Sequence, residues 1–532
     1  MKKNILSNKY YLYATEFFAG MAVMAVELGA SRLLAPYFSS SQIVWTIIIG
    51  TIMIAMALGN IYGGRSADRD PRPDRLYRRL LVSAVWIAAI PVVGKYIILG
   101  ISGVLILTIN TNFLIWAAFF ACMILFVFPL FLLGTVTPSL VKYTMGSMEE
   151  SGKTVGALGA CNTIGSIIGT FLPTFVTIPA VGTSITFLIF SGILLLLGLL
   201  YFLNRKTAKG AVAVSVILFV LCSVLGHSGS FAFWETGLTY EGESIYNYLQ
   251  VKEDDRSVIL STNVLFGVQS IKMKEDGLTG MYYDYALAAP LMADVPGKEK
   301  TEILILGMGT GTYAHQCKKY FDNVAVEGVE IDQKITDLAG TYFDLPSDIP
   351  VTTYDGRAYL QAIDKKYDVI MVDAYQDITI PFQMSSAEFF ELVREHLKED
   401  GVMVVNMNMK SDGAGGINVC LADTISSVFS NVYTVDVKGA TNRELFASEN
   451  ENMLTLLSEN RKQLNQEELT AMMGQVEDNL MAYESTGELL TDDKAPVEVL
   501  GMRVIDELIQ DEIGYYKDIF RERGLEGLIR SI

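Results

Sequence analysis

Cysteine is scarce in this chain, with 5 residues among 532, and histidine is scarcer still, with 3. The cysteines show no paired spacing, so the sequence predicts neither a disulfide framework nor a zinc site. No other cluster of metal-ligating side chains is apparent, and we expect no metal centre. The first apolar run has no clear cleavage site and is too long for a signal peptide. We therefore interpret that run as a helix of the protein.

Positive charge is under-represented in the second half of the chain. Residues 1–230 carry 16 Lys and Arg against 7 Asp and Glu, whereas residues 231–532 carry 25 against 52. Such an acidic part would repel the phosphates of nucleic acid, which we exclude as a partner, and it suits a cationic substrate. The hydrophobic fraction of 51% excludes a disordered chain and argues against a purely soluble enzyme. The sequence therefore predicts a basic, apolar domain followed by an acidic, soluble part.

Residues 1–230 are predicted to form a transmembrane domain of about seven helices. Most of the apolar runs reach the ~20 residues that a helix needs to cross the hydrocarbon core, and the last is short for that. The predicted segments are 11–35, 43–62, 80–100, 113–137, 157–179, 184–203 and 211–226. The fifth segment holds a GxxxG pair, Gly165 and Gly169, which we interpret as a site of close helix packing.

The lysines and arginines of this domain predict its orientation in the cell membrane. They cluster in segments that lie inside if the N-terminus is cytoplasmic, and the opposite side keeps only Arg32 and Lys95. Seven crossings from a cytoplasmic N-terminus leave the acidic half outside, whereas a re-entrant or interfacial seventh segment leaves it inside. We expect a multi-pass protein with the lipid bilayer as a partner.

Two carboxylates fall within the first predicted helix. Glu16 and Glu27 are functional candidates, because an ionisable group inside a membrane is costly. The alternative is structural, with Glu16 near the inner interface and Glu27 paired with Arg32 near the outer one. Both interpretations stay open at this point.

The acidic half shows the pattern of an α/β domain. Residues 231–300 are predicted to form a small antiparallel β-unit, and strands then alternate with helices over residues 301–450. This alternation predicts a mostly parallel, doubly wound domain of the Rossmann-like, class I methyltransferase-like type. Residues 451–532 are acidic and helical, and we interpret them as a structural or oligomer-forming appendage. A homo-oligomer is therefore a candidate assembly.

Ligands of such sheets bind at the carboxyl ends of the strands, and three groups of residues stand there in series. Three glycines after the first strand let the backbone approach a ligand closely. A glutamate ends the second strand, where it can accept hydrogen bonds from a ribose diol, and an Asp-Gly pair closes the third, where an adenine amino group could be met. A dinucleotide is less favoured, because the loop lacks GxGxxG spacing, and turn glycines with surface carboxylates are the structural alternative. The predicted nucleoside-pocket residues are Gly307, Gly309, Gly311, Glu330, Asp355 and Gly356.

Four motifs, in this order, resemble those of the spermidine synthase (polyamine aminopropyltransferase) family. They are Leu306-Gly-Met-Gly-Thr-Gly, Val329-Glu-Ile-Asp, Asp355-Gly-Arg and Tyr367-Asp-Val-Ile-Met-Val-Asp-Ala-Tyr. The front half is similar to the multi-pass membrane branch of that family, and so is a segment near the end. The residues that carry this second likeness are Glu27-Leu-Gly-Ala-Ser-Arg, Gly63-Gly-Arg-Ser-Ala-Asp-Arg and Leu490-Thr-Asp-Asp-Lys-Ala-Pro. The resemblance covers nearly the whole chain.

The resemblance implies an aminopropyltransferase with decarboxylated S-adenosylmethionine as co-substrate, a diamine such as putrescine as acceptor and no tightly bound cofactor. It implies Asp373 as the proton acceptor, and the chemistry agrees, because an alkylammonium must lose a proton before it reacts. Asn247 would contact the nucleoside, together with the six pocket residues. On the amine side the resemblance points to Gln269, Tyr283, Asp284, Tyr375 and Asp377.

One departure from the family leaves the donor open. Soluble members carry an aspartate in the glycine loop that contacts the aminopropyl amine, and here that position is Thr310. A membrane-anchored methyltransferase using S-adenosylmethionine itself is therefore an alternative. A polyamine transporter or sensor, motivated by Glu16 and Glu27, is another. Because the adenosyl donor is held in the cytoplasm, we expect a cytoplasmic catalytic domain and a seventh segment that does not cross.

Overall fold

The computed structural model divides into two compact units, each with a hydrophobic core of its own. It describes residues 9–38, 40–109, 112–145, 151–227, 230–232, 234–235, 237–262, 267–374, 380–408 and 415–531. The helical unit comprises Met1–Thr236, Glu241–Tyr248 and Asn263–Leu265. The sheet unit comprises Gly237–Tyr240, Leu249–Thr262 and Phe266–Ile532.

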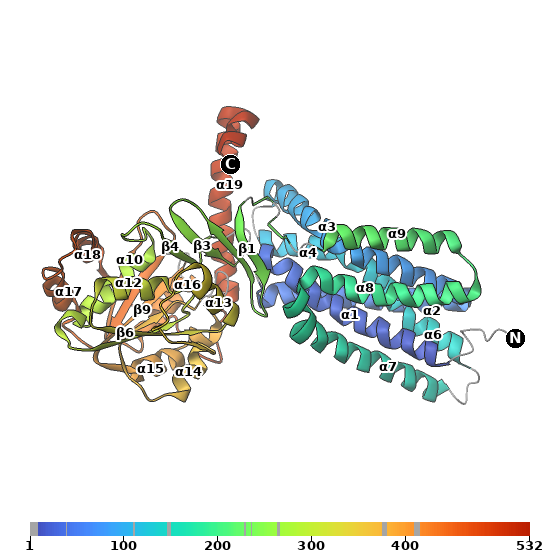
Figure 1. The fold of residues 1–532 in the computed structure, drawn as a ribbon, viewed down its shortest axis with the longest axis horizontal. Coiled ribbons are helices and arrows are strands. Elements are labelled where there is room, and N and C mark those ends of the chain that lie inside the picture. Colours follow the sequence, from blue (N-terminus) through green and yellow to red (C-terminus); the bar gives the residue numbers. More distant parts are fainter. Residues whose placement is uncertain are drawn as a thin grey trace. The chain divides into compact units, whose positions relative to one another are not determined.

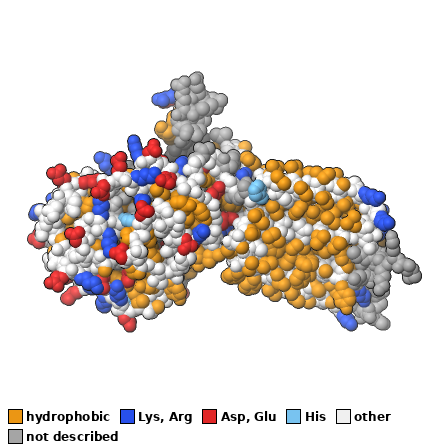
Figure 2. All heavy atoms as spheres, in the orientation of Figure 1, with side chains coloured by type: hydrophobic (Ala, Val, Ile, Leu, Met, Phe, Trp, Pro, Cys, Tyr) orange, Lys and Arg blue, Asp and Glu red, His pale blue; other side chains and the backbone are white. Residues whose placement is uncertain are grey.

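Long apolar helices build the helical unit (Figure 1). Their bounds are α1 Lys9–Phe38, α2 Gln42–Arg69, α3 Pro73–Thr108, α4 Phe113–Leu125, α5 Val127–Gly134, α6 Val136–Thr144, α7 Ser151–Leu172, α8 Ile178–Arg205 and α9 Lys209–Gly226. Among the described residues, six helical stretches are long and apolar enough to cross a membrane. Figure 2 shows hydrophobic side chains over most of the visible face of this unit, with most of its visible Lys and Arg side chains at one end.

The structure has six such stretches where the sequence predicts seven, because the fifth and sixth predicted segments form one stretch. Residues Gly152–Arg205 form a single stretch, because a π-helical turn at Pro173–Thr177 joins α7 to α8 without a loop. At 54 residues this stretch would measure ~81 Å if straight, far more than the ~30 Å hydrocarbon core. Gly182 breaks the helical geometry with φ at +80°. Both α7 and α8 pack along α1, so the stretch folds back on itself (Figure 1).

A proline bends the fourth predicted segment, which the structure divides into α4, α5 and α6. Pro129 has no N–H for the carbonyl of Leu125, one turn earlier. The indole N–H of Trp86 donates to that carbonyl at 3.0 Å, and the Ser83 hydroxyl donates to the Pro129 carbonyl at 3.1 Å. The Trp86 side chain of α3 therefore replaces the helical hydrogen bond that the proline removes, as an apolar surrounding requires.

Glu16 lies fully buried inside the helical unit. Its carboxylate accepts hydrogen bonds from the Thr137 hydroxyl of α6 at 2.5 Å and from the Asn162 amide of α7 at 2.9 Å. Both bonds reach the same oxygen and join three helices, while the other oxygen has no hydrogen-bond partner among the described residues. 

The segment after α9 packs on one end of the helical unit. Tyr37, at the end of α1, donates to the Phe231 carbonyl at 2.8 Å. Glu243 accepts from the N–H and the hydroxyl of Thr183 in α8, both at 2.6 Å. Arg32 also donates to a carbonyl in this segment. The chain therefore leaves the helical unit at the end of α1, whereas the arginine-rich turn between α2 and α3 lies at the far end of α2.

An eight-stranded sheet forms the centre of the sheet unit, with strand order β12-β10-β11-β9-β8-β5-β6-β7. The five strands from β9 to β7 run parallel, and β11, β10 and β12 are antiparallel additions. A separate sheet has the order β1-β2-β3-β4. The bounds are β1 Leu238–Glu243, β2 Tyr248–Glu253, β3 Ser257–Ser261, β4 Ser270–Met273, β5 Thr301–Leu306, β6 Val324–Glu330, β7 Val351–Thr353, β8 Tyr367–Val372, β9 Leu397–Met407, β10 Asn431–Asp436, β11 Arg443–Ser448 and β12 Met481–Ala482. The predicted doubly wound α/β domain with a small preceding β-unit is confirmed.

Helices cover both faces of the large sheet (Figure 1). Alternate residues of one strand supply the two cores, since Val404 belongs to one and Val405 to the other. The predicted C-terminal appendage contributes to the first core, where Leu457 of α17 and Met473 of α18 are fully buried. The helices are α10 Tyr282–Ala286, α11 Ala288–Met292, α12 Thr312–Tyr320, α13 Gln333–Tyr342, α14 Gly356–Ala362, α15 Ala387–Glu395, α16 Ile417–Ser426, α17 Met453–Arg461, α18 Glu467–Asn479 and α19 Val497–Ser531.

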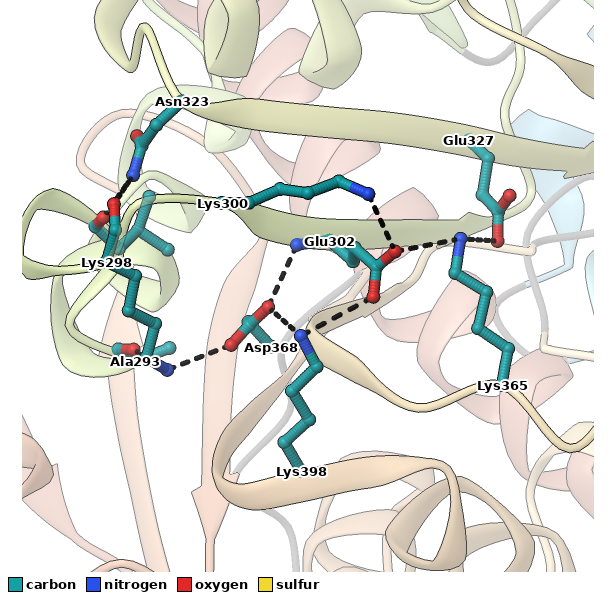
Figure 3. A network of polar contacts seen from close by, with 10 residues as sticks. Ala293, Lys298, Lys300, Glu302, Asn323, Glu327, Lys365, Asp368 and Lys398 are labelled. Atoms are coloured by element: carbon teal, nitrogen blue, oxygen red, sulfur yellow. Dashed lines mark hydrogen bonds and ion pairs between the residues drawn. The ribbon is translucent and has the colours of Figure 1, made fainter.

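A network of lysines and carboxylates joins the amino-terminal ends of the central strands (Figure 3). Asp368, at the start of β8, is its buried centre, with a side chain 1% exposed. It accepts from the ammonium groups of Lys298 at 2.9 Å and Lys398 at 2.7 Å, and from the Glu302 N–H at 2.9 Å. These contacts tie β5, β8 and β9 together at the amino-terminal ends of the strands. The carboxyl ends, on the opposite side, stay available for ligands.

The GxxxG pair packs directly on the backbone of α1. A Cβ on Gly165 would lie 2.0 Å from the Phe17 carbonyl oxygen, and one on Gly169 would lie 2.1 Å from that of Met21. The predicted close helix packing is confirmed.

Replacing Gly169 with leucine should therefore push α1 and α7 apart. We expect a loss of about 1–3 kcal/mol, because the added atoms meet backbone that cannot rotate away. Thermal unfolding in detergent measures it. Gly159→Leu on the same helix, where a Cβ meets nothing within 4 Å, is the matched control and should leave the unfolding temperature nearly unchanged. Equal stability of the two variants would contradict the packing.

Candidate active site

The predicted donor-side residues of the sheet unit stand along one edge of the large sheet, where the carboxyl ends of the parallel strands meet. In the spatial order β11, β9, β8, β5, β6 and β7, that edge carries Glu444, Asn406, Asp373, the glycine loop, Glu330 and Asp355. β11 runs antiparallel to β9, so a residue near its beginning lies beside the end of β9.

The glycine loop turns tightly against two neighbouring segments. Gly307 has φ at +86°, and a Cβ there would lie 2.4 Å from the Asp373 carbonyl oxygen. Gly309 has φ at +55°, and a Cβ there would lie 2.5 Å from the Ser270 hydroxyl. That hydroxyl accepts the Thr310 N–H at 3.2 Å. Only glycine fits these positions without strain, so the loop geometry accounts for the sequence pattern.

Glu330 ends β6 with its carboxylate turned toward the glycine loop. One oxygen accepts the Gly309 N–H at 2.8 Å, and the other accepts the Asp332 N–H at 3.0 Å. The side chain is almost fully buried, and burial raises its pKa to about 7. An ionised carboxylate has further lone pairs, which leaves capacity for donors such as ribose hydroxyls.

Asp355 and Gly356 begin α14 at the edge of β7. Asp355 is the N-cap residue, and its carboxylate accepts the Ala358 N–H at 2.9 Å. The next residue, Arg357, forms a bidentate ion pair with Asp492 at 2.6 and 2.7 Å. The late motif that begins at Leu490 is thus attached to the start of α14.

Asp373 follows β8 directly and is held by two side chains. The Tyr282 hydroxyl donates to one carboxylate oxygen at 2.6 Å, and the Asn406 amide donates to the other at 2.9 Å. Asn406 in turn accepts from the Asn442 amide at 2.9 Å. Burial raises the pKa of Asp373 to about 7, although both hydrogen bonds favour the charged form. Such a carboxylate can accept a proton near neutral pH.

The predicted amine-side residues lie close by in different roles. Tyr283 is buried against the Tyr282 ring, with centroids 4.0 Å apart, and its hydroxyl donates to the Gln269 carbonyl at 2.8 Å. Asp284 accepts two hydrogen bonds from Thr279 and one from the Gly280 N–H. The Asp284 carboxylate therefore holds the turn before α10.

Three further predicted site residues are outside the part of the sheet unit that the structure describes. Tyr375 and Asp377 fall in 375–379, outside the described residues. Asn247 belongs to the helical unit, where its N–H donates to the Ser244 hydroxyl at 2.9 Å. Their assignments stay predictions. Within the described part of the chain, no group of three or more His, Cys, Asp or Glu is arranged to hold a metal ion.

Comparison with known proteins assigns this chain to a family. A family model described as the spermine/spermidine synthase domain matches residues 282–432. A protein of Bifidobacterium longum (strain NCC 2705), named probable polyamine aminopropyl transferase, is 57% identical over 351 residues, which cover 63% of this chain and 78% of that protein. The chain belongs to the polyamine aminopropyltransferase family.

More distant members resemble a smaller part of this aminopropyltransferase. The polyamine aminopropyltransferase of Hydrogenobaculum sp. (strain Y04AAS1) is 30% identical over 175 residues, which cover 31% of this chain and 59% of that protein. Among solved structures, a probable spermidine synthase from Corynebacterium glutamicum ATCC 13032 is 22% identical, with a TM-score of 0.35 over 43% of this chain and 86% of that one.

Three side chains at this site of the aminopropyltransferase were not among the residues predicted from the sequence. Tyr282 contacts Asp373, whereas the predicted site residues are its neighbours Tyr283 and Asp284. Asn406 ends a predicted strand, so the strand-end rule that selected Glu330 could have found it too. Glu444 had no such signal, because its strand was not predicted.

Gly307→Ala should destabilise the sheet unit by about 1–3 kcal/mol, because the residue would keep a left-handed backbone and its methyl group would meet the Asp373 carbonyl. Chemical denaturation of the purified protein measures this. The control is Gly340→Ala in α13, where a Cβ meets nothing and stability should rise by about 0.5–1 kcal/mol. If Gly307→Ala were as stable as the parent, the close approach of the loop to β8 would be wrong.

Proposed function

We propose that this protein is a membrane-anchored aminopropyltransferase that moves an aminopropyl group from decarboxylated S-adenosylmethionine to a diamine such as putrescine. The observation that carries the proposal is Asp373, a buried carboxylate with a pKa of about 7 beside the glycine loop. An alkylammonium loses its proton with a pKa of about 10, so it needs a base before its nitrogen can attack.

In this reaction the acceptor nitrogen forms a bond to the carbon of the aminopropyl chain that is attached to the sulfur. The carbon–sulfur bond breaks, methylthioadenosine leaves as a neutral thioether, and Asp373 takes the proton of the amine. Tyr282 and Asn406 orient the carboxylate by occupying one lone pair on each oxygen. The remaining lone pairs are available to the amine.

The other end of the edge would hold the nucleoside. Glu330 would accept hydrogen bonds from the ribose hydroxyls, and Asp355 with Gly356 would meet the adenine. Gly307, Gly309 and Gly311 would let the backbone approach the donor. The order of these residues along the strands supports this assignment, since the sulfur of the donor would then lie near Asp373.

The direct test uses the purified protein with the decarboxylated donor and putrescine, and its readout is release of methylthioadenosine. We expect turnover with at least one diamine. Bound donor without turnover for any diamine would overturn the proposal.

One observation favours a second candidate, a methyltransferase that uses S-adenosylmethionine. Thr310 stands in the loop where soluble members carry a carboxylate, and its buried hydroxyl oxygen has no hydrogen-bond partner among the described residues. Titration calorimetry with the two nucleosides separates the candidates. Strong preference for the decarboxylated donor eliminates the methyltransferase.

Asp373→Asn should lower turnover by about 10²–10⁴-fold while donor affinity stays the same, because the amide keeps the shape and cannot take a proton. Steady-state kinetics and calorimetry measure the two effects. Glu330→Gln is the contrasting variant, and its donor affinity should fall by about 10- to 150-fold through loss of charged hydrogen bonds. Parent-like turnover of Asp373→Asn would assign the proton to another group.

The pH profile should report the environment of Asp373. The base works when it is ionised, so turnover at saturating substrate should fall as pH drops below about 7. Tyr282→Phe removes a hydrogen bond that favours the ionised form, and the acid limb should therefore move to higher pH. Tyr285→Phe, whose hydroxyl contacts the Lys438 N–H instead, is the control. An acid limb that does not move in Tyr282→Phe would exclude Asp373 as its source.

The helical unit supplies the membrane anchor in this proposal. Its six long apolar stretches support spanning, and α9 exposes a row of large apolar side chains that includes Ile217 and Val224. The predicted cytoplasmic placement of the catalytic part requires that the seventh predicted segment, 211–226, does not cross the membrane. That segment corresponds to α9. At 18 residues, α9 has the length and hydropathy of a span and packs along α3 and α8. Its geometry therefore favours a crossing.

We accordingly expect the arginine-rich α2–α3 turn and the catalytic part to lie on opposite sides of the membrane. Single cysteines at Arg72 and Asp276, whose side chains are 70% and 93% exposed, test this in a background without the native cysteines. A membrane-impermeant thiol reagent should label one variant in intact cells and the other only after lysis. Labelling of both from the same side would show that one helical stretch does not cross.

That experiment also determines the absolute orientation. Labelling of the Asp276 position in intact cells would agree with the positive-inside rule and require an extracellular donor. Labelling of the Arg72 position instead would place the catalytic part in the cytoplasm, as the location of the donor predicts.

A further inference from the structure

Four arginines at one end of the helical unit have no carboxylate partner among the described residues. They lie in the last two turns of α2 and the second turn of α3, and they are Arg65, Arg69, Arg78 and Arg79. The aspartates of this region bind other cations, in the pairs Asp70 with Arg72 and Arg75, Asp68 with Lys142, and Asp74 with Arg205. The four guanidinium groups therefore carry positive charge that no nearby carboxylate neutralises, and they favour an anion.

A strip of partly exposed aromatic rings begins beside these arginines. We call it the aromatic strip, and its members from α2, α5 and α3 are Tyr62, Phe131, Phe128 and Trp86. The ring centroids of Tyr62 and Phe131 are 5.3 Å apart, and those of Phe128 and Trp86 are 4.9 Å apart. The outer face of α5 is thus bordered by an aromatic side chain of α2 and one of α3. Inside a membrane, such an apolar surface would contact acyl chains.

Arg79 connects the arginines to the aromatic strip. Its guanidinium donates to the Ser66 hydroxyl at 2.6 Å and lies over the Tyr62 ring, 5.1 Å from the centroid. On α3, Trp86 follows Arg78 by two turns on the same exposed face, at ~12 Å along the helix. Positive charge therefore stands at one end of an apolar surface that continues along the helices.

An anionic phospholipid matches both parts of this surface. Its phosphate accepts paired hydrogen bonds from guanidinium groups, for which arginine is better suited than lysine. Its acyl chains would lie on the aromatic strip. A free phosphate would satisfy the arginines and leave the strip uncovered. A zwitterionic lipid would cover the strip, but it carries a cation of its own that the arginines repel.

We propose that α2, α3 and α5 form a binding site for an anionic phospholipid, whose phosphate binds the four arginines and whose acyl chain covers the aromatic strip. This inference rests on the membrane anchoring proposed above and is independent of the reaction at Asp373. The bound lipid adds a second link between α2 and α3, beside the hydrogen bond from Arg79 to Ser66.

Quenching of tryptophan fluorescence by brominated lipids tests the inference. Two single-tryptophan proteins, which keep Trp86 or Trp116 and have phenylalanine at the other tryptophan positions, are placed in phosphatidylcholine bilayers. Trp86 is 38% exposed and Trp116 is 44% exposed, and α4, which holds Trp116, has no Lys or Arg. A small fraction of phosphatidylglycerol with brominated acyl chains is added, and brominated phosphatidylcholine is the reference.

We expect Trp86 to report enrichment of the anionic lipid by at least about fivefold over random mixing, the factor that one arginine contributes near an anionic headgroup. Trp116 should report random mixing. Arg65→Gln/Arg78→Gln should lower the enrichment at Trp86 by about fivefold or more.

Lys206→Gln/Lys209→Gln is the matched control for the arginine variant. It removes the same charge at the same end of the helical unit, from exposed side chains at the turn between α8 and α9. The enrichment at Trp86 should stay unchanged in this variant.

The outcomes separate this inference from the proposed anchoring. If brominated lipid with either headgroup quenches neither tryptophan, the anchoring itself is overturned. Equal quenching of Trp86 by the two brominated lipids overturns the lipid site alone. An equal loss of enrichment in the arginine and lysine variants overturns it as well, because general surface charge would then account for the effect. If the arginine variant does not fold, equal enrichment at Trp86 and Trp116 without that change overturns the site.

Discussion

The contact between Gly307 and the backbone of Asp373 is the constraint on which the rest of the site depends. It brings the end of β5 against the end of β8, so the glycine loop and Asp373 share one small volume. Burial follows from that closeness, and the raised pKa of Asp373 follows from the burial. Hydrogen bonds from Tyr282 and Asn406 keep the carboxylate available as an ion. The site therefore holds a poorly solvated carboxylate in a fixed orientation.

Much of this arrangement is predictable because it depends on local patterns. The five parallel strands follow from alternating apolar runs and turns, and residues such as Glu330 and Asp355 are found because every parallel strand ends at the same edge. The sequence was less informative where antiparallel strands extend the sheet. Glu444 enters the site only through the pairing of β11 with β9, a contact between segments about 40 residues apart that no local period encodes.

Side-chain direction was the second limit on prediction. Tyr282, Tyr283 and Asp284 are consecutive, yet the first reaches Asp373, the second reaches the Gln269 carbonyl, and the third holds its own turn. Neighbouring residues on a short helix point in different directions, and their partners come from distant segments. In the helical unit the apolar runs were located well. The boundary predicted between residues 179 and 184 coincides with the bend at Gly182, whereas the π-helical turn at Pro173–Thr177 had no signal in the sequence, because no polar loop marks it.

The ion pair between Arg357 and Asp492 makes the start of α14, where the predicted site residues Asp355 and Gly356 lie, dependent on a segment made 135 residues later. Asp492 also accepts from the Ser386 hydroxyl at 2.6 Å, so one late carboxylate secures both the start of α14 and the cap of α15. When β11 has just left the ribosome, every strand of the parallel core has been synthesised, but Asp492 and its ion pair with Arg357 are still missing. The nascent chain can form the sheet early, but the wall beside Asp355 closes only when synthesis is nearly finished.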